Sequence, residues 1–500
     1  RSTLFPYTTL FRSPAGNNLK VSPMDALISG IASDGGLFVP ETFPNPLNLK
    51  ELMNLSYKDL AVKILSLFFT DFSEDELKSC AENAYDEKFS IPSIVNTKEV
   101  GNKFFIELFH GETSAFKDMA LSILPHLLSV ALKNKASDKK VLILTATSGD
   151  TGKAALEAFK NIENLKIFVL YPENGVSNIQ KMQMQTQEGN NVCVLGIKGN
   201  FDDCQNAVKN IFNDKELINF IGQRNTVFSS ANSINIGRLM PQIVYYFYSY
   251  FTVLKEKNIS DFPEISITVP TGNFGNILAA YYAKLLGLPV KNLICASNEN
   301  CVLTDFGKSG IYDKNRTLIL SSSPSMDILI SSNLERFLYH LSEGDSKFIK
   351  DIMTELKEKG KYQIPDFLSE KIKFMKFYSS KEKETFENIN SFFKETSYLL
   401  DPHTAVANCC EDKYEAEFDA PEFNFIASTA SPYKFSNAVL TALKENVENL
   451  NDFQKMERLN EISKVQIPKN LSALKNKPVR FNQSAYEKDI PTFLKEFVNK

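Results

Sequence analysis

The sequence has no tryptophan, only four histidines and seven cysteines among its 500 residues. The cysteines are odd in number and scattered, and no C-x-x-C pair occurs. This pattern favours reduced thiols in the cytoplasm over a disulfide framework or a zinc site. No apolar run approaches the roughly 18 residues that a membrane-spanning helix needs. The net charge of −4 provides no basic surface for nucleic acid or an anionic membrane.

Lys117 is the most informative residue that is present. It lies at the end of the segment FHGETSAFK, among apolar, glycine and hydroxyl residues. A lysine held in apolar surroundings loses its proton more easily, and a neutral amine can attack a carbonyl. The aldehyde of pyridoxal phosphate (PLP) is such a carbonyl, and a lysine is its usual protein anchor. Because most lysines are solvated and unreactive, the interpretation depends on three further segments.

The first segment is VLILTATSGDTG, residues 141–152, followed by the helix-forming run KAALEAF. The aliphatic run predicts a buried parallel strand. The turn after it can present amides and hydroxyls to a carboxylate or phosphate at a helix start. It is not a P-loop, because only two residues separate Gly149 from Gly152 and an alanine follows Lys153. A well-capped turn with Asp150 or Thr151 near the cap is the equally weighted alternative.

The second segment is ISITVPTGNFGN, residues 265–276, again followed by an alanine-rich helix. Gly272 and Gly275 permit a positive φ and close backbone approach, and the amides at the helix start can hold a phosphate. The spacing is not the dinucleotide fingerprint, so NAD is not expected. Taken alone, the motif more often forms a tight turn.

The third segment is FIASTASPYKF, residues 425–435, which predicts a late strand ending in small hydroxyl residues. A serine or threonine at that end can hydrogen-bond a neutral ring nitrogen without protonating it. A polar loop without a ligand is the alternative interpretation.

Five motifs, in the order HGETSAFKD, TATSGDTGKAA, SSANSINIGR, PTGNFGN and STASPYKF, closely resemble the threonine synthase family in its longer microbial and fungal branch. The resemblance begins near Ile31 and continues close to the end of the chain. It implies an α/β protein with the tryptophan-synthase-β-like PLP fold. That fold has two open, mostly parallel sheets flanked by helices, and here a helical N-terminal domain. The family implies conversion of O-phospho-L-homoserine and water to L-threonine and phosphate, by γ-elimination followed by β-addition, in a monomer or homodimer.

The resemblance also implies a role for each motif residue. Lys117 would be the Schiff-base lysine and proton shuttle, and Thr429 would face the pyridine nitrogen. The cofactor phosphate would lie on Gly272, Asn273, Phe274, Gly275 and Asn276. The substrate's amino-acid end would lie near Thr147, Ser148 and Asp150, and its phosphate near Asn232, Ser233 and Arg238.

The chain departs from the family at two places. Glu112 stands where the family usually has proline, which removes a rigid φ and adds a charge. Residues 1–13 open without methionine and look like non-native adapter sequence, so we exclude them from the fold. Two histidines remain open: His110 is either near the cofactor or packed in a loop, and His403 is either structural or near the substrate.

The pattern along the chain predicts five segments. Residues 14–98 form a mainly helical domain, with Ser73 as the N-cap of a helix over 74–85. Residues 99–250 form a first α/β domain that carries Lys117. Residues 251–450 form a second one, with the phosphate loop and a helical insertion at about 334–394. Residues 451–500 form a covering segment.

Two other functions remain possible from the sequence. Another PLP lyase, such as a phosphohomoserine phospho-lyase or a serine/threonine dehydratase, would keep Lys117, the GNFGN loop and Thr429. A simple dehydratase has no need of a phosphate site around Arg238. A non-catalytic relative that binds metabolites is the more distant alternative, and the intact lysine and glycine loops argue against it.

Overall fold

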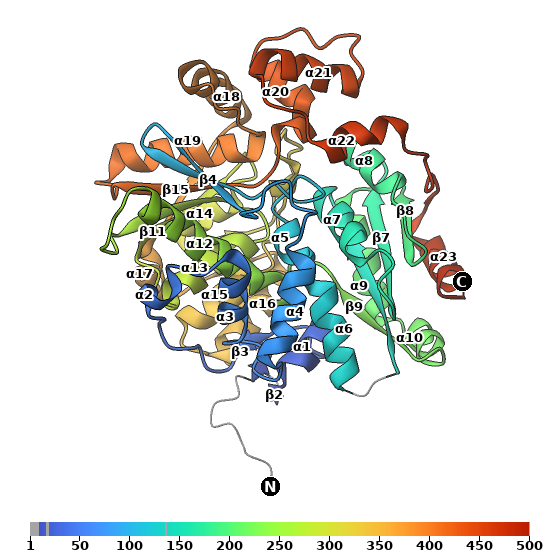
Figure 1. Cartoon of the computed structure of the whole chain (residues 1–500). Coiled ribbons are helices and arrows are strands. Elements are labelled where there is room, and N and C mark those ends of the chain that lie inside the picture. The colour runs from blue at the N-terminus through green and yellow to red at the C-terminus, as the bar shows by residue number, and fades with distance from the viewer. Residues whose placement is uncertain (1–9, 17–19, 136–137, 500) are drawn as a thin grey trace.

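Two open β-sheets form the centre of the molecule in the computed structural model, which describes residues 10–16, 20–135 and 138–499 (Figure 1). The first is a five-stranded sheet in the order β16-β8-β7-β6-β9, and all its pairs are parallel. Its strands are β6 (Lys140–Ala146), β7 (Leu165–Pro172), β8 (Val192–Ile197), β9 (Thr226–Ser230) and β16 (Ser484–Ala485).

Alternate side chains of this sheet enter two separate apolar cores. On β6, Val141 and Ile143 belong to the core that contains the buried residues of α7. Leu142 and Leu144 belong to the core that contains the buried residues of α9. Both faces are therefore covered, which is why residues 141–144 form a continuous apolar run rather than an alternating one. The helices of this region are α5 (Asp118–Leu121), α6 (Leu124–Asn134), α7 (Asp150–Phe159), α8 (Asn178–Gln185), α9 (Phe201–Asn213) and α10 (Lys215–Gly222).

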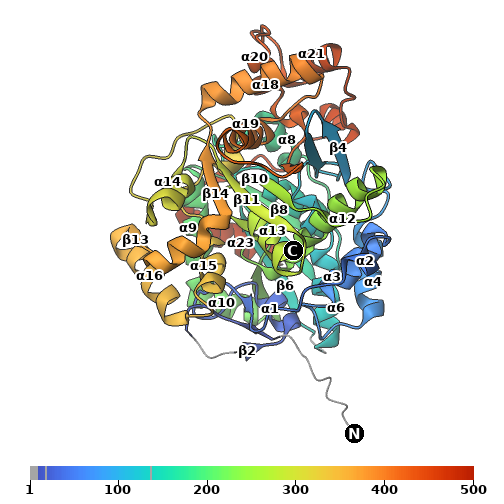
Figure 2. The same ribbon diagram turned by 90° about the vertical axis from the view of Figure 1, so that its left-hand side faces the viewer.

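The second sheet has six strands in the order β14-β11-β10-β15-β5-β4. All neighbours are parallel except β4 and β5, and Figure 2 shows β14, β11 and β10 side by side. The strands are β4 (Asn96–Val100), β5 (Lys103–Glu107), β10 (Ile265–Pro270), β11 (Val290–Ser297), β14 (Met375–Ser379) and β15 (Phe423–Ser428). The two sheets match the architecture expected from the sequence.

Helices α12, α13 and α19 connect or cover the second sheet. The helical residues between β9 and β10 form two helices divided at Pro241, because proline begins a helix but lacks the N–H that would continue one. The helices of this region are α11 (Ile236–Leu239), α12 (Pro241–Glu256), α13 (Gly275–Leu285), α14 (Val302–Ser309), α15 (Leu334–Leu341), α16 (Ser346–Lys359), α17 (Asp366–Lys371), α18 (Glu382–Thr396), α19 (Pro402–Glu417) and α20 (Ser436–Ala442). A two-stranded ribbon, β12 (Ile311–Asp313) and β13 (Lys361–Gln363), lies beside them.

The N-terminal region is mainly helical (Figure 1, blue). It contains α1 (Pro23–Ser29), α2 (Leu49–Leu52), α3 (Tyr57–Leu65) and α4 (Glu74–Ala84). Ser73 caps α4 as predicted: its hydroxyl accepts the N–H of Glu76, and the Glu76 carboxylate accepts the N–H of Ser73. This reciprocal box satisfies two amides that a helix start leaves free.

A small antiparallel sheet precedes these helices. Its strands are β1 (Phe11–Arg12), β2 (Lys20–Val21) and β3 (Val39–Pro40). Phe11 and Arg12, which belong to the segment 1–13 excluded above as non-native, form β1, and Phe11 is fully buried, so the fold includes these two residues. Residues 1–9 lie outside the described part of the chain.

The sequence pattern does not predict the positions of two strands in the sheets. β5 lies within the predicted first α/β domain but pairs with β15, so it belongs to the second sheet. β14 lies inside the segment expected to be a helical insertion, yet it forms the edge of the same sheet. Its alternation of buried Met375 and Phe377 with a half-buried Lys376 is too short to stand out among the surrounding helices.

The last part of the chain runs over the surface of both sheets. It includes α21 (Asp452–Ser463), α22 (Lys469–Ser472) and α23 (Ile490–Asn499). β16 extends the five-stranded sheet, and Asn470 donates to the carbonyl of Glu112, with a nitrogen-to-oxygen distance of 2.6 Å. The boundaries between domains stay predictions. Within the described residues, no helix combines the length and apolarity needed to cross a membrane.

Candidate active site

The sequence motifs meet because each follows the carboxyl end of a parallel strand. β10, β15 and β5 are adjacent in the second sheet, and they lead to the Thr271–Asn276 loop, to Thr429 and to Lys117. From the first sheet, β6 leads to Thr147 and β9 to Asn232. The crevice outside the carboxyl ends of parallel strands is where open α/β sheets bind ligands.

A cavity lies at this meeting point. Eight of its lining residues are the consecutive residues 270–277, and the others come from loops and helices outside the strands. They are Phe116, Lys117, Thr151, Asn232, Ser233, Arg238, Gln242, Pro270, Thr271, Gly272, Asn273, Phe274, Gly275, Asn276, Ile277, Ser325, Met326, His403 and Thr429.

Lys117 is half-buried in the wall of the cavity, and its Nζ lies 5.8 Å from the centroid of the Phe116 ring. Burial, together with the positive charges of Arg238 and Lys434, lowers the pKa of its amine to about 8, against the opposing effect of Asp150. Lys117 Nζ forms no ion pair with a described residue. An amine in this state is available to react with an aldehyde near neutral pH.

The loop between β10 and α13 presents backbone amides to the cavity. Phe274, the N-cap of α13, has a left-handed φ of 62°, and no side chain caps the helix. The first amides of α13 are therefore left for another acceptor. Gly272 permits close packing, because a Cβ there would lie 2.6 Å from the carbonyl oxygen of Ser325.

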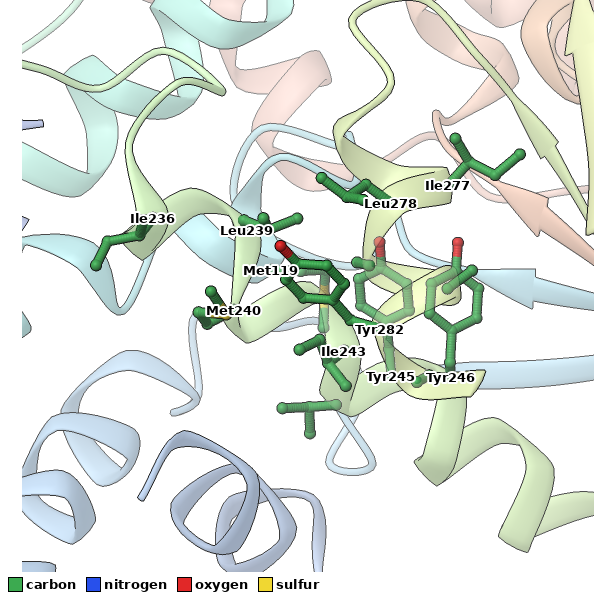
Figure 3. Packing of buried hydrophobic residues seen from close by; sticks show 14 of the residues in the cluster. Met119, Ile236, Leu239, Met240, Ile243, Tyr245, Tyr246, Ile277, Leu278 and Tyr282 are labelled. Carbon is green, nitrogen blue, oxygen red and sulfur yellow. The ribbon is translucent and has the colours of Figure 1, made fainter. Parts of the chain in front are cut away.

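Two buried donors beside this loop have no partner among the described residues: Asn276 Nδ2 and Arg238 Nε. The Asn276 amide is oriented by two tyrosines, since its Oδ1 accepts hydrogen bonds from the hydroxyls of Tyr245 and Tyr246. Figure 3 shows these tyrosines among the apolar side chains of α11, α12 and α13. Unpartnered buried donors and an uncapped helix start fit an anionic group, as the phosphate of PLP is.

Thr429 lies opposite the phosphate loop. Its carbonyl accepts the N–H of Phe116 at 2.8 Å, which fixes it beside the lysine segment. Its hydroxyl makes no hydrogen bond with a described residue, and the residue lines the cavity. This arrangement fits a hydroxyl that meets a ring nitrogen.

Asn232, Ser233 and Arg238 also line the cavity, as the sequence predicts. Asn232 Nδ2 donates to the carbonyl of Ala146 at 3.0 Å, and one Arg238 Nη donates to the carbonyl of Ala231. Burial lowers the pKa of Arg238 to about 10, so it stays a cation near neutrality. The segment therefore offers a charged donor to an anion in the cavity.

Thr147, Ser148 and Asp150 lie beside the cavity without lining it. Thr147 Oγ1 accepts the N–H groups of Gly149 and Gly152, at 2.9 and 2.8 Å, which closes the turn before α7. Asp150 is buried and bound by Lys434, whose Nζ lies 2.5 Å from Asp150 Oδ1. Only Thr151 of this turn reaches the lining.

The two open histidines have different positions. His403 lines the cavity: its Nδ1 lies 2.8 Å from Asp401 Oδ1, and its Nε2 accepts the N–H of Ser325 at 3.3 Å. His110 is not among the lining residues, and its Nε2 lies 3.0 Å from Glu107 Oε2. Glu112, the departure from the family, is half-buried, and burial raises the pKa of its carboxyl.

Sequence reasoning missed Gln242, Ser325 and Met326. Ser325 and Met326 belong to η1 (Pro324–Met326), in the loop between β12 and α15, and Gln242 is the second residue of α12. Lys434 was present in the STASPYKF motif but was given no role. Its side chain is fully buried. The signal available in the sequence was a lysine between two aromatic residues, Tyr433 and Phe435.

The comparisons with known proteins agree with this geometry. A family model for the threonine synthase N terminus matches residues 10–85, and one for pyridoxal-phosphate-dependent enzymes matches residues 91–416. The chain belongs to the threonine synthase family. The threonine synthase of Saccharomyces cerevisiae is 37% identical over 474 residues, covering 87% of this chain and 89% of the yeast protein.

A solved structure of PLP-bound threonine synthase from Brucella melitensis matches with a TM-score of 0.86 and 34% identity, covering 98% of this chain and all of that one. The human protein threonine synthase-like 1 is 40% identical over 435 residues, which are 84% of this chain and 58% of that protein. The chain thus spans somewhat over half the length of this relative. The threonine synthase family, the PLP fold and the PLP cofactor expected from the motifs are confirmed.

Proposed function

We propose that this enzyme is a threonine synthase, which converts O-phospho-L-homoserine and water to L-threonine and phosphate. The observation that carries the proposal is that one cavity has two kinds of anion donor. The uncapped start of α13 serves one phosphate, and Arg238 with Asn232 and Ser233 serves a second. A cofactor phosphate and a substrate phosphate together need such a pair.

PLP, when bound, supplies the electron sink that stabilises carbanions of an amino-acid substrate. In this proposal its aldehyde is held by Lys117, its phosphate by the Gly272–Asn276 loop, and its ring nitrogen by the Thr429 hydroxyl. Support comes from the free donors of Asn276 and Arg238 and from the unbonded hydroxyl of Thr429.

Lys117 is assigned the proton transfers at the substrate's Cα and Cβ. Its lowered pKa, about 8, lets the same amine give and accept a proton near neutrality. Arg238 is assigned the leaving phosphate, because a guanidinium stays charged and binds phosphate oxygens in pairs. One such contact contributes about 3–4 kcal/mol to a transition state.

The substrate's amino-acid end is assigned to the turn at Thr147, Ser148 and Asp150. Thr147 already serves the turn itself, so Ser148 and the amides at the start of α7 are the groups left for a carboxylate. A cytoplasmic location and a monomer or homodimer complete the proposal. The free thiols of Cys409 and Cys410, adjacent in sequence, agree with a reducing compartment.

The deciding experiment is a product assay. The reconstituted enzyme is incubated with O-phosphohomoserine, and threonine is separated from 2-oxobutyrate by chromatography. We expect threonine and phosphate in equal amounts. 2-Oxobutyrate without threonine would replace the proposal with a phosphohomoserine phospho-lyase.

A second measurement tests the assignment of Lys117. PLP bound through a lysine absorbs visible light, and we expect this band in the native enzyme and its loss in Lys117→Ala. A colourless native protein after incubation with PLP would favour a non-catalytic relative instead.

A further inference from the structure

Asp150 forms a buried ion pair with Lys434, and the charges of both residues act on Lys117. Lys434 has no role in the site described so far. The side chains are 4% and 0% exposed, and Lys434 Nζ is 2.5 Å from Asp150 Oδ1. Removing two charges from water costs free energy that their attraction only partly offsets, so a buried ion pair is weak evidence for a stabilising role and suggests another one.

Every oxygen of the Asp150 carboxylate is occupied by a group other than Lys117. Oδ1 accepts from Lys434 and from Gln180 Nε2, the latter at 2.9 Å, and Oδ2 accepts from the Ser325 hydroxyl at 3.3 Å. These donors come from η3 (Pro432–Phe435), α8 and η1. Lys117, although close enough to feel the charge of Asp150, is left without an ion pair.

Lys434 is itself fixed in place. Its Nζ also donates to the carbonyl of Thr113 at 3.0 Å, four residues before Lys117. The Lys434 ammonium therefore links the segment that carries Lys117 to the turn that carries Asp150. Because it is fully buried, solvent does not weaken its effect on the neighbouring amine.

We propose that Lys434 is a positioning residue: it holds the Asp150 carboxylate away from Lys117 and keeps the Lys117 amine reactive. Without Lys434, Asp150 would become the natural ion-pair partner of Lys117 and would hold that lysine as an ammonium. This inference rests on the proposed role of Lys117 as the amine that bonds the cofactor.

The charged or titratable groups around Lys117 are few. Asp150 lies on α7, Arg238 on α11, Lys434 in η3 and His403 on α19. Asp118 on α5 is turned away, since its two oxygens accept the N–H and the hydroxyl of Thr113 at 2.8 and 2.6 Å. The balance at Lys117 is thus two cations that oppose protonation and one carboxylate that favours it.

The test measures the reactivity of Lys117 against pH in full-length protein freed of cofactor. Formaldehyde and cyanoborohydride are the probe: the unprotonated amine adds to the aldehyde with loss of water, and cyanoborohydride supplies the hydride. Mass spectrometry of the Lys117 peptide then gives the pH of half-maximal labelling.

Lys434→Met is expected to raise this midpoint by about half to one pH unit, because a cation is lost and a carboxylate is released toward Lys117. Asp150→Asn is expected to lower it, and Lys434→Arg to keep it near the native value. A merely structural role would not give opposite shifts for the two partners of one ion pair. No shift in Lys434→Met, or shifts of the same sign in both variants, would overturn the inference.

Lys103→Met is the matched control. Lys103 is also buried and bonded, to Asn408 at 3.0 Å, but its ion-pair partner is Asp412 and its charge is not among those that act on Lys117, so its loss should leave the midpoint unchanged. If Lys434→Met does not fold, Lys434→Gln, which also removes the charge, takes its place, and the same two outcomes would overturn the inference. In the holoenzyme, the pH midpoint at which the visible absorption band titrates should shift in the same direction in each variant.

The labelling result is independent of catalysis. Threonine formation with unmoved midpoints would reject only the role of Lys434. Midpoints that move as expected, with no threonine formed, would reject only the proposed function.

Discussion

The hydroxyl of Tyr245 donates a 2.6 Å hydrogen bond to Asn276 Oδ1, and this bond determines which way the Asn276 amide faces. Tyr246 donates to the same oxygen. With the oxygen taken twice, Nδ2 is the atom left for a ligand, and it has no partner among the described residues.

Asn276→Asp is therefore expected to weaken PLP binding by about 10- to 100-fold, which is the loss of one buried donor. The change keeps the shape and both tyrosine hydrogen bonds, but it places an oxygen where the phosphate needs a donor. Absorbance titration of cofactor-free protein with PLP measures the effect. Tyr245→Phe is the control, since Tyr246 still orients the amide, and its PLP affinity should stay within about threefold of native. Equal affinities of native protein and Asn276→Asp would remove Asn276 from the phosphate site.

Gly272→Ala and Gly275→Ala should distinguish an effect on packing, seen in the unfolding free energy, from an effect on PLP affinity. A Cβ on Gly272 would meet the Ser325 carbonyl oxygen at 2.6 Å, whereas one on Gly275 would meet only side chains, at 3.6 and 3.7 Å. We expect Gly272→Ala to lose about 1–3 kcal/mol of unfolding free energy through overpacking. Gly275→Ala should keep the stability of cofactor-free protein but weaken PLP binding, because Gly275 lines the cavity and its Cβ would lie 3.7 Å from Ser233, which lines it too. Urea unfolding and PLP titration of both variants check this, and normal PLP affinity in Gly275→Ala would contradict the placement.

Arg238→Ala is expected to raise the KM for O-phosphohomoserine while the visible cofactor band remains. Loss of a charged contact worth about 3–4 kcal/mol corresponds to about 100- to 1,000-fold in kcat/KM. Steady-state kinetics with a spectrum of each preparation measures both quantities. An unchanged KM would show that Arg238 stabilises the fold and does not bind the substrate phosphate.

Glu411 should make the stability of the fold depend on pH. It is fully buried on α19, its Oε1 has no partner among the described residues, and burial raises its pKa from 4.5 to about 7. A carboxyl whose folded pKa is raised favours the folded state when protonated, so this contribution is complete below pH 4.5 and is lost as the pH rises through 7.

Glu411→Gln cannot ionise and should avoid that loss. At a pH of about 8 we expect the variant to exceed the native protein by about 1–3 kcal/mol in unfolding free energy, and at a pH of about 4.5 to lie close to it. Urea unfolding at both pH values gives the comparison. A difference that is the same at both values would mean that shape, not charge, decides the effect.

The local sequence indicated most residues of the candidate site. Strand, turn and helix succeed one another within each motif, so Lys117, the Gly272–Asn276 loop and Thr429 could be chosen as candidates, and they line one cavity. Ser73 as a helix cap was predictable for the same reason, since a capping box depends on four consecutive residues.

Other parts had no local signal. Ser325 enters the site from a loop without motif character, and its place depends on contacts with Asp150 and His403, which are 175 and 78 residues away. β14 was hidden because an edge strand needs only two or three buried side chains.

The sequence by itself determined which chemical groups this protein has and that each follows a strand, because short-range backbone geometry is set by neighbouring side chains. Only the tertiary structure decided that β5 pairs with β15, bringing Lys117 beside Thr429 from more than three hundred residues away. It also decided that Asp150 bonds Lys434 instead of Lys117. Strand order and ion-pair partners result from the packing of the whole chain, for which no single segment carries a pattern.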